Sequence, residues 1–472
     1  MVKNSMRQNL GAPNFVHKTK KVMNRELERR ALEYHACGRS GKSEVIPTKP
    51  FGSVDELSMA YTPGVAAPVA EIFKERWKAY RYTNKGNLVA VISNGSAVLG
   101  NGNVGALASK PVMEGKAMLF KIFADIDAFD IEISDEEPEK IISTIASLAP
   151  TFGGINLEDI KAPECFYIEE RLCSLLDIPV LHDDQHGTAA VVSAALLNAC
   201  EIAGKNIGCI SIVICGAGAA GISIARMLVE IGADREKMIM VDSKGVINSS
   251  RTGLDSIKSE FATRQEYTTL SQAMTNADVF IGVSKGGVLS VQDIEVMSES
   301  PIIFALANPT PEIDFDTARR VRPDAIVATG RTDLPNQINN SILFPYLFRG
   351  ALDTLATKIN SHMLIAAAHA VASIAKQPVI AKVEKQYSHS LKFGPEYILP
   401  KMSDPRLLTE VSSAVAQAAM DSGVARRGIA SFKEYRDTLA SRVESSNFFS
   451  NEMIRHRHNT KKHRNSNECF NI

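Results

Sequence analysis

Short apolar runs alternate with amphipathic stretches from Leu88 onwards, which is the pattern of an α/β fold. Before this region, Glu26 to Tyr34 has a helical pattern and leads into a polar stretch that ends at Pro50. Short β-branched runs are typical of buried strands, and longer stretches with a period of 3.6 are typical of helices. The expected strands are residues 88–93, 128–133 and 178–183, and the expected helices are 111–124, 138–148, 162–176 and 187–203.

A second α/β region begins at ISIVIC, residues 210–215, where Ser211 is the only polar member. A helical pattern over 221–232 follows, and four more short apolar strands are expected at residues 238–242, 278–283, 301–307 and 325–330. Five such strands, separated by segments long enough for crossover helices, predict a parallel doubly wound sheet of the Rossmann type. Beyond Phe344 the pattern is helical to about Ala440, and we expect these helices to pack back on the first domain.

These patterns predict an α/β protein with two domains and additional C-terminal helices. The expected parts are a basic N-terminal arm (1–28), a substrate and metal domain (29–186), a dinucleotide-binding domain (187–345), the C-terminal helices (346–449) and a basic, disordered tail (450–472). A transit peptide is an alternative interpretation of the N-terminal arm. Arg and Ser are scarce there and no apolar face is evident, which favours a solvated arm.

The composition is that of an ordinary enzyme. Of the 472 residues, 45% are hydrophobic, and Lys plus Arg equal Asp plus Glu at 53 each, so no global field favours nucleic acid or an acidic membrane. No apolar run reaches the ~18 residues of a membrane span. The best candidate, Met363 to Ala375, is too short and contains His369. Seven cysteines without a CxxC spacing indicate buried thiols in a reducing compartment, so we expect a cytoplasmic protein.

Two glycine turns match GxGxxG, at residues 100–105 and 216–221. After Gly221 an uninterrupted amphipathic helix is expected, whose N-terminus can face a pyrophosphate. After Gly105 we expect the helix to start only at Pro111, too late for its N-terminus to face a pyrophosphate. We therefore expect this first turn to support a substrate pocket. The predicted dinucleotide site is therefore the second turn, made of Gly216, Ala217, Gly218, Ala219, Ala220 and Gly221.

Asp242 ends the next expected strand and is followed by Ser243 and Lys244. A carboxylate at this position can bind the 2′-hydroxyl of the ribose in NAD. Ser243 and Lys244 can instead bind the 2′-phosphate of NADP. These residues alone leave the choice between NAD and NADP open.

Three carboxylates stand upstream of this turn, Glu158 and Asp159 as a pair and Asp184 in LHDDQHGTAA. Oxygen ligands of this kind suit Mg²⁺ or Mn²⁺ and leave room for the oxygens of a bound acid. The alternative is that the acids only stabilise helix N-termini. We favour a metal site, because Asp184 follows a strand at the edge where open α/β sheets bind ligands. The flanking His182 and His186 suit hydrogen bonding better than ligation.

Two further residues suit proton transfer. Tyr61, in AYTPGVA, can donate a proton if its phenol is buried in a polar site. Lys116 begins a mostly apolar helix face, where partial burial and a nearby metal lower the pKa of a lysine toward that of a base. Taken singly, Tyr61 can equally be an aromatic packed in a turn and Lys116 a surface lysine.

The chain resembles the malic enzymes, from about Arg29 to Met420. The resemblance is carried by AYTPGVAAPVAEI, GNGNVGALASKPVMEGKAMLF, GGINLEDIKAPECF, LHDDQHGTAAVVSAALLNA, GAGAAG, ALANPTPEI and NNSILFPYLFRGALD. It is closest to the small bacterial NADP-dependent branch. Long bacterial members carry a phosphotransacetylase-like C-terminal domain where this chain has a short basic tail, so we expect regulation through that domain to be absent.

The resemblance implies roles for individual residues. It makes Tyr61 the proton donor and Lys116 the proton acceptor, and it makes Glu158, Asp159 and Asp184 the metal ligands. It also assigns contacts with substrate or cofactor to Asn308 and to Asn339 or Asn340. One departure is Asn101, a polar residue where the family has an apolar side chain, and we expect it to perturb the local packing.

The expected function is the metal-dependent oxidative decarboxylation of L-malate to pyruvate and CO₂, with NADP favoured over NAD. One alternative is a hydroxy-acid dehydrogenase without decarboxylation, which has no need of three carboxylates. Another is a catalytically weak dinucleotide-binding sensor, which requires a missing catalytic group. The expected partners are small-molecule substrates and further copies of the chain, in a homodimer or a larger homo-oligomer.

Overall fold

A computed structural model describes residues 25–36, 40–50, 52–98, 100–387 and 390–442. The chain separates into two units, residues 1–41 with 458–472, and residues 42–457. In the first unit the described element is α1 (Arg25–Ala36), which covers the helix expected at Glu26 to Tyr34. Most of the predicted N-terminal arm and all of the predicted basic tail, 450–472, lie outside the described residues.

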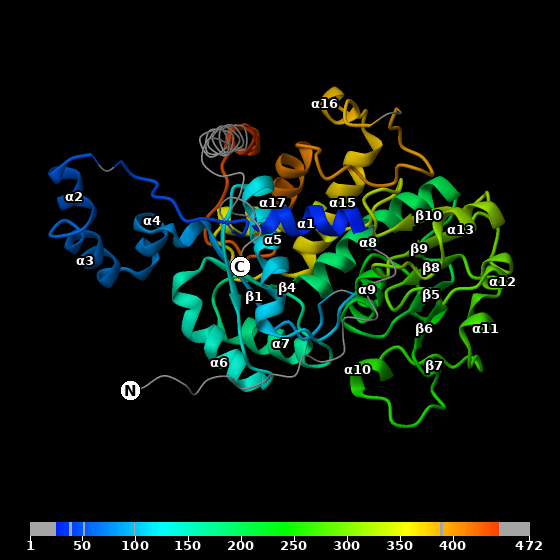
Figure 1. The fold of residues 1–472 in the computed structure, drawn as a ribbon. Helices are drawn as coiled ribbons and strands as arrows, with labels where there is room; N and C mark the ends of the chain where they lie inside the picture. The colour runs from blue at the N-terminus through cyan, green and yellow to red at the C-terminus, as the bar shows by residue number, and fades with distance from the viewer. Residues whose placement is uncertain (1–24, 37–39, 51, 99, 388–389, 443–472) are drawn as a thin grey trace. The chain divides into compact units, whose positions relative to one another are not determined.

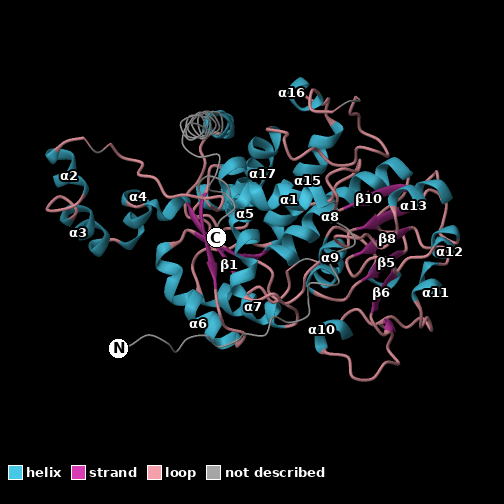
Figure 2. Cartoon of the chain, in the orientation of Figure 1, coloured by secondary structure: helices cyan, strands magenta, loops and turns pink. Residues whose placement is uncertain are grey.

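The second unit contains one parallel sheet and a second sheet that is parallel except for one edge strand, and Figure 2 shows them as two groups of strands with helices between them. The first sheet has the strand order β2-β1-β3-β4. Its strands are β1 (Leu88–Ser93), β2 (Asp127–Glu132), β3 (Gly154–Leu157) and β4 (Val180–His182). Its helices are α5 (Ala106–Ala124), α6 (Pro138–Leu148) and α7 (Glu164–Leu175). Since all neighbours are parallel, the carboxyl ends of these strands share one edge of the sheet.

The second sheet has the order β10-β9-β8-β5-β6-β7 and follows a dinucleotide-binding topology. Its strands are β5 (Ile212–Cys215), β6 (Met238–Asp242), β7 (Gly245–Val246), β8 (Val279–Gly282), β9 (Ile302–Ala305) and β10 (Ile326–Thr329). Helices α9 (Ala219–Glu230), α10 (Ser256–Ser259), α11 (Leu270–Met274), α12 (Val291–Glu295) and α13 (Phe315–Val321) lie between them. The strand order reverses at β5, between β6 and β8, and this is where such sheets open a crevice for ligands.

Helix α8 (Asp183–Ala203) joins the two sheets and lies in their shared core. It packs on α9, and its alanines and valines are almost fully buried. Within the described residues, α8 is the one helix long and apolar enough to cross a membrane, and 67% of that stretch is buried inside the protein. Its first residues, Asp183 and Asp184, lie at the carboxyl end of β4.

The C-terminal helices pack on α5 of the first α/β region and on α8. They are α14 (Phe344–Asp353), α15 (Ser361–Lys376), α16 (Ala381–Glu384) and α17 (Ser412–Asp421). Helix α14 packs on α5, α15 packs on α8, and α17 covers both α14 and α15. Figure 1 shows α15 and α17 beside α5 and α8. A buried pair on α14, Arg349 and Asp353, is joined by two side-chain hydrogen bonds, and the Tyr435 hydroxyl donates a further one to Asp353.

Three short helices precede the first sheet, α2 (Val54–Ala60), α3 (Ala66–Lys74) and α4 (Ala79–Tyr82). We call residues 53–82 the arm, which is distinct from the basic N-terminal arm predicted for residues 1–28. None of its three α-helices has a buried residue. The arm therefore contributes nothing to the cores described above.

Three element predictions were wrong. Strand β3 was not expected, because GINL is short and flanked by glycines, and Glu158 with Asp159 therefore seemed to lie in a loop. Helix α5 begins at Ala106 and not at Pro111, so Pro111 is the sixth residue of the helix and leaves the carbonyl of the exposed Leu107 without its helical hydrogen bond. Helix α8 begins at Asp183, ahead of the expected Gly187.

The described cysteines support the expectation of thiols, since Cys165, Cys173, Cys200, Cys209 and Cys215 are all free. Cys165, Cys200 and Cys215 are buried, whereas Cys209 is exposed. Burial raises the pKa of the Cys165 and Cys200 thiols to about 12, so both are inert at neutral pH. Cys37 and Cys469 lie outside the described residues.

Candidate active site

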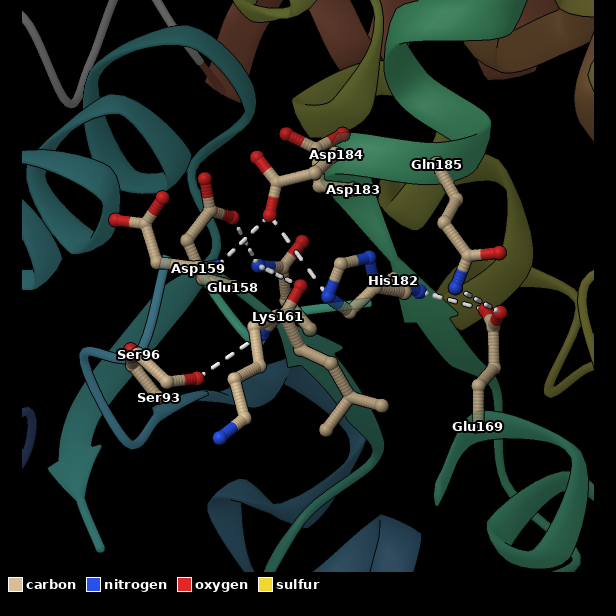
Figure 3. Close-up of polar contacts among 12 residues, drawn as sticks. Ser93, Ser96, Glu158, Asp159, Lys161, Glu169, His182, Asp183, Asp184 and Gln185 are labelled. Carbon is tan, nitrogen blue, oxygen red and sulfur yellow. Dashed lines mark hydrogen bonds and ion pairs between the residues drawn. The ribbon is translucent and has the colours of Figure 1, made fainter. Parts of the chain in front are cut away.

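The predicted carboxylates meet at the carboxyl edge of the first sheet. Leu157, the last residue of β3, pairs with His182, the last residue of β4. The residues that follow each strand are therefore neighbours, and the backbone N–H of Asp159 donates to Asp184 Oδ2 at 2.8 Å. Figure 3 shows Glu158, Asp159 and Asp184 together at these strand ends. The structure thus brings together the three side chains that the sequence proposed as one group.

Lys116 reaches this cluster from α5. Its side chain is 7% exposed, and Nζ lies 2.9 Å from Glu158 Oε1 and also hydrogen-bonds to Asp183. The ring of Phe344, the first residue of α14, lies 4.1 Å from the ammonium. Lys116 is therefore neither exposed nor isolated, which excludes the alternative that it is a surface lysine.

The sequence predicted that burial and a nearby metal lower the pKa of Lys116, whereas the protein side chains by themselves raise it. Burial by itself lowers the pKa of this lysine, but the charges of Asp183 and Glu158 outweigh burial and raise it. Burial raises the pKa of Glu158 well above its usual range, and the neighbouring Asp184, Asp183 and Asp159 add to this effect against the opposing charge of Lys116. One ammonium thus faces several carboxylates.

Asp183 is the functional side chain that the sequence reading passed over. Its carboxylate accepts hydrogen bonds from Lys116 and from Asn340 Nδ2, the latter at 2.6 Å. The carboxylate folds back over its own helix, where a Cβ on Gly187 would lie 1.8 Å from Asp183 Oδ1. The observed position of the Asp183 carboxylate therefore requires glycine at residue 187. The glycine in HDDQHG was the feature of the sequence that could have indicated a role for Asp183.

Glu169 on α7 holds the turn between β4 and α8. Its carboxylate accepts hydrogen bonds from the His182 backbone N–H at 2.7 Å and from Gln185 Nε2 at 3.0 Å, and it lies 2.9 Å from His186 Nε2. Burial alone would lower the pKa of His186, but Glu169 reverses this and raises it. His186 is thus engaged by Glu169, in agreement with the hydrogen-bonding role expected for it.

The chemistry of this cluster suits a divalent cation, although the side chains are not arranged as a finished ligand cage. Within the described ranges, no three Asp, Glu, His or Cys side chains surround one point as metal ligands. However, the buried Asp183 Oδ1 and Asn156 Oδ1 accept no hydrogen bond from any described residue. Buried oxygens normally have a donor or a cation, and here carboxylates outnumber the one lysine. Glu158, Asp159 and Asp184 therefore fit a hard cation by charge and donor type.

Each of the three glycines in residues 216–221 is needed for a different physical reason. Gly216 has φ of +126°, and a Cβ there would lie 2.6 Å from Val283 O. A Cβ on Gly221 would lie 1.7 Å from Gly216 O, so this glycine lets α9 start against β5. A Cβ on Gly218 would meet no atom within 4 Å. Gly218, at the N-terminus of α9, therefore leaves open the space in which a pyrophosphate approaches the backbone.

Asp242, at the carboxyl end of β6, is already paired. Arg251 donates to both of its carboxylate oxygens, at 2.9 and 3.0 Å, and Lys258 Nζ lies 3.5 Å away. The backbone N–H of Lys244 also donates to Asp242 Oδ1. Burial alone would raise the pKa of Asp242, but Arg251 and the other contacts hold it below its usual range. Arg251 and Lys258 were missed, because nothing in the sequence indicates that they turn toward Asp242.

The remaining predicted residues are dispersed. Asn340 joins the site through Asp183, whereas the Asn339 side chain accepts a hydrogen bond from the Ser341 N–H. Asn308 follows β9, and its backbone O would lie 3.1 Å from a Cβ on Gly100, so the two loops meet. Asn101 is exposed, with its N–H bonded to Val98 O, so the expected packing disturbance was wrong.

Tyr61 is not brought to the cluster. It ends α2 in the arm, its side chain is 69% exposed, and no described residue hydrogen-bonds to its phenol. The condition for proton donation by Tyr61, a phenol buried in a polar site, is therefore not met within the single chain.

The fold and the site define a class of two-part α/β proteins, in which a Rossmann-type dinucleotide unit adjoins a second parallel sheet bearing a lysine and carboxylates. Residues 40–136 and 132–173 match the family "Malic enzyme, N-terminal domain", and residues 185–421 match "Malic enzyme, NAD binding domain". This chain belongs to the malic enzyme family, which confirms the resemblance found in the sequence.

Individual relatives agree with this assignment. The chain is 54% identical to the "NADP-dependent malic enzyme" of Halomonas elongata, over 84% of this chain and 94% of that one. It is 51% identical to the "NADP-dependent malic enzyme" of Salmonella typhimurium, over 90% of this chain but 57% of the relative, so it spans little more than half of such longer proteins. Among solved structures, the malic enzyme from Pyrococcus horikoshii has a TM-score of 0.84 and 43% identity, covering 93% of this chain and 100% of that chain.

Proposed function

We propose that the protein catalyses the oxidative decarboxylation of L-malate to pyruvate and CO₂, with reduction of NADP. The observation that carries this proposal is the contact of buried Lys116 with Glu158 and Asp183, at the end of a sheet that adjoins a dinucleotide-binding unit. A buried lysine among carboxylates is suited to proton transfer with a hydroxy acid. The similar proteins from Salmonella typhimurium and Halomonas elongata are named NADP-dependent malic enzymes, which supports the same reaction.

In this proposal Lys116 takes the proton of the C2 hydroxyl of malate. The raised pKa of Lys116 means that the resting side chain carries its own proton, so it must first release it. Asp183 is hydrogen-bonded to Lys116 and is placed to accept that proton, while Asn340 keeps Asp183 in position. Tyr61 donates a proton to C3 after CO₂ has left. Asn308 and Asn339 are proposed to contact substrate or cofactor.

Glu158, Asp159 and Asp184 would hold Mg²⁺ or Mn²⁺. When bound, the dinucleotide would supply the hydride acceptor and the cation would supply positive charge beside the enolate left by decarboxylation. A hydroxy-acid dehydrogenase without decarboxylation has no use for three convergent carboxylates. A non-catalytic sensor has no use for a buried lysine among them.

We further propose that NADP is preferred to NAD. A carboxylate that binds the ribose of NAD must have its oxygens free for the two hydroxyls, whereas both oxygens of Asp242 are engaged by Arg251. The side chains of Lys244, Arg251 and Lys258 outnumber this one carboxylate, so the excess charge favours a 2′-phosphate. Similar proteins include both NADP-dependent and NAD-dependent malic enzymes, so the preference is a property to be measured.

A steady-state assay tests the reaction. Purified protein is incubated with L-malate, Mn²⁺ or EDTA, and NADP or NAD, and reduced dinucleotide and CO₂ are measured together. We expect equal amounts of both products, dependence on Mn²⁺ and a preference for NADP. Reduced dinucleotide without CO₂ would indicate the plain dehydrogenase, and absence of both products would support the sensor.

A further inference from the structure

The turn that carries Asp183 and Asp184 is linked to the dinucleotide-binding helix α9 through one side chain, Gln185. The Nε2 atom of Gln185 donates to Glu169 Oε2 at 3.0 Å, and its Oε1 atom accepts a hydrogen bond from the Ser223 hydroxyl at 3.3 Å. Figure 3 shows the Gln185 amide turned toward the Glu169 carboxylate. From the first turn of α8, Gln185 thus connects α7 with α9.

The three side chains of this link are shielded from solvent. Gln185 is 2% exposed, Ser223 is 5% exposed and Glu169 is 8% exposed. Burial alone would raise the pKa of Glu169, but His186 and His182 reverse this and lower it, so the carboxylate is ionised at neutral pH. An ionised carboxylate can only accept hydrogen bonds. The Gln185 amide therefore has one orientation, with its nitrogen toward Glu169 and its oxygen toward Ser223.

Each end of the link lies next to a proposed binding site. Glu169 also accepts the backbone N–H of His182 at 2.7 Å, so it holds the segment that continues to Asp184, a proposed metal ligand. Ser223 is the fifth residue of α9 and follows Gly221, which belongs to the glycine turn proposed to receive the pyrophosphate. A dinucleotide that fixes the start of α9 and a cation that fixes Asp184 therefore order the same buried link.

The hydrogen bond between Ser223 and Gln185 differs in kind from the rest of this helix contact. Helix α8 packs on α9, and Ser223 is the single polar side chain among the buried residues of α9. Apolar contacts are non-directional, whereas a hydrogen bond specifies both a distance and an angle. The link through Gln185 therefore relates the position of α9 to the position of the turn before α8.

We propose that Gln185 is a positioning residue that couples the two sites, so that NADP at the start of α9 and a divalent cation at Asp184 strengthen each other's binding. The first ligand to bind orders the link, and the second ligand then finds it already ordered. By thermodynamic linkage, each ligand must raise the affinity for the other by the same factor. The inference rests on the proposed function for the identity of both ligands, and it adds the side chain that joins their sites.

Two binding titrations measure this coupling in the absence of malate and of turnover. Free Mn²⁺ is followed by electron paramagnetic resonance with and without saturating NADP, and NADP binding is followed by fluorescence with and without Mn²⁺. In the parent protein we expect each ligand to tighten the binding of the other about 5- to 10-fold. Ser223→Ala removes one hydrogen bond of the link and Gln185→Leu removes both, so this factor should fall to about twofold or less in each variant.

Ser193→Ala is the matched control. Ser193 is a buried serine on α8 whose hydroxyl has no hydrogen-bond partner among the described residues, so this variant should keep the coupling factor of the parent. General damage to the fold weakens the binding of each ligand but leaves the ratio between the two titrations unchanged. The coupling factor is therefore a readout that a purely structural role of Gln185 would not change.

The outcomes separate this inference from the proposed function. If the parent binds both ligands without mutual effect, or if Ser223→Ala keeps the parent factor, the coupling through Gln185 is wrong and the proposed reaction is unaffected. Ser223→Ala removes a single oxygen atom, so it decides the question even if Gln185→Leu does not fold. If the parent binds no Mn²⁺, the proposed metal site is wrong, and the coupling that rests on it is wrong as well.

Discussion

The ammonium of Lys116 lies over the ring of Phe344, 4.1 Å from its centre, although the two residues come from opposite sides of the dinucleotide-binding sheet in the sequence. Phe344 is the first residue of α14 and stacks edge-on against Phe120, one helical turn after Lys116. The aromatic ring and the carboxylates of Glu158 and Asp183 thus hold the lysine from different sides. A cation–π contact at a desolvated site contributes ~2 kcal/mol to keeping the ammonium in this place.

The first prediction concerns Lys116 itself. Replacement by alanine should lower the rate of malate oxidation by about 10²- to 10⁴-fold, because the proposed base is lost. Binding of NADP, measured by fluorescence titration, should be unchanged, since Lys116 is on α5 beside the first sheet and not in the dinucleotide-binding sheet. Lys110→Ala, a half-exposed lysine on the same helix, is the control and should stay close to the parent rate. A Lys116→Ala protein within tenfold of the parent rate would remove Lys116 from the mechanism.

The second prediction concerns the metal. Asp184→Asn and Glu158→Gln keep the shape of each side chain but remove a charge, so both should weaken Mn²⁺ binding at least tenfold. Free Mn²⁺ measured by electron paramagnetic resonance gives this binding directly, without reliance on activity. The exposed Glu137→Gln is the control and should bind Mn²⁺ like the parent. Either site variant with the parent affinity for Mn²⁺ is then not a ligand.

The third prediction concerns the choice of dinucleotide. Arg251→Ser removes a charged donor that is worth about 1.5–3 kcal/mol in a hydrogen bond, so the KM for NADP should rise about 10- to 100-fold. The KM for NAD should change little or fall, because Asp242 becomes free to accept the ribose hydroxyls. Arg235→Ser, whose guanidinium binds backbone carbonyls away from Asp242, is the control. A parallel rise of both KM values would indicate damage to the fold and not a loss of phosphate recognition.

The fourth prediction concerns stability. Asp353→Asn leaves the fully buried Arg349 without its counter-charge, which should lower the free energy of unfolding by about 3–5 kcal/mol. Burial alone would raise the pKa of Asp353, but Arg349 reverses this and lowers it. The contribution of Asp353 is therefore complete above its unfolded-state pKa of about 3.9, and it is lost as the pH falls through the lower folded-state value.

Chemical denaturation at several pH values measures this effect. The difference in unfolding free energy between parent and Asp353→Asn should be constant at neutral pH and shrink in acid. An Arg349→Met, Asp353→Leu double variant removes both charges and should recover much of the loss. A difference that does not depend on pH would show that Asp353 acts by packing and not by charge.

The sequence by itself determined the two α/β regions, the doubly wound dinucleotide-binding sheet with its glycine turn after β5, and the grouping of Glu158, Asp159 and Asp184. It could do so because buried parallel strands are continuous apolar runs, and because residues that follow neighbouring strands meet at one edge of the sheet. The family resemblance supported Lys116 as the proton acceptor, but its burial depends on which face of α5 packs inward.

Only the tertiary structure decided the contacts that cross between elements. Strand β3 is too short to recognise, yet it places Glu158 beside Asp183. The pKa of Lys116 is raised and not lowered, because the sign depends on two carboxylates from other elements. Arg251 pairs with Asp242 through a turn whose path is set by packing. The exposure of Tyr61 likewise could not be predicted, because local sequence specifies a helix and a turn but not whether its own chain covers them.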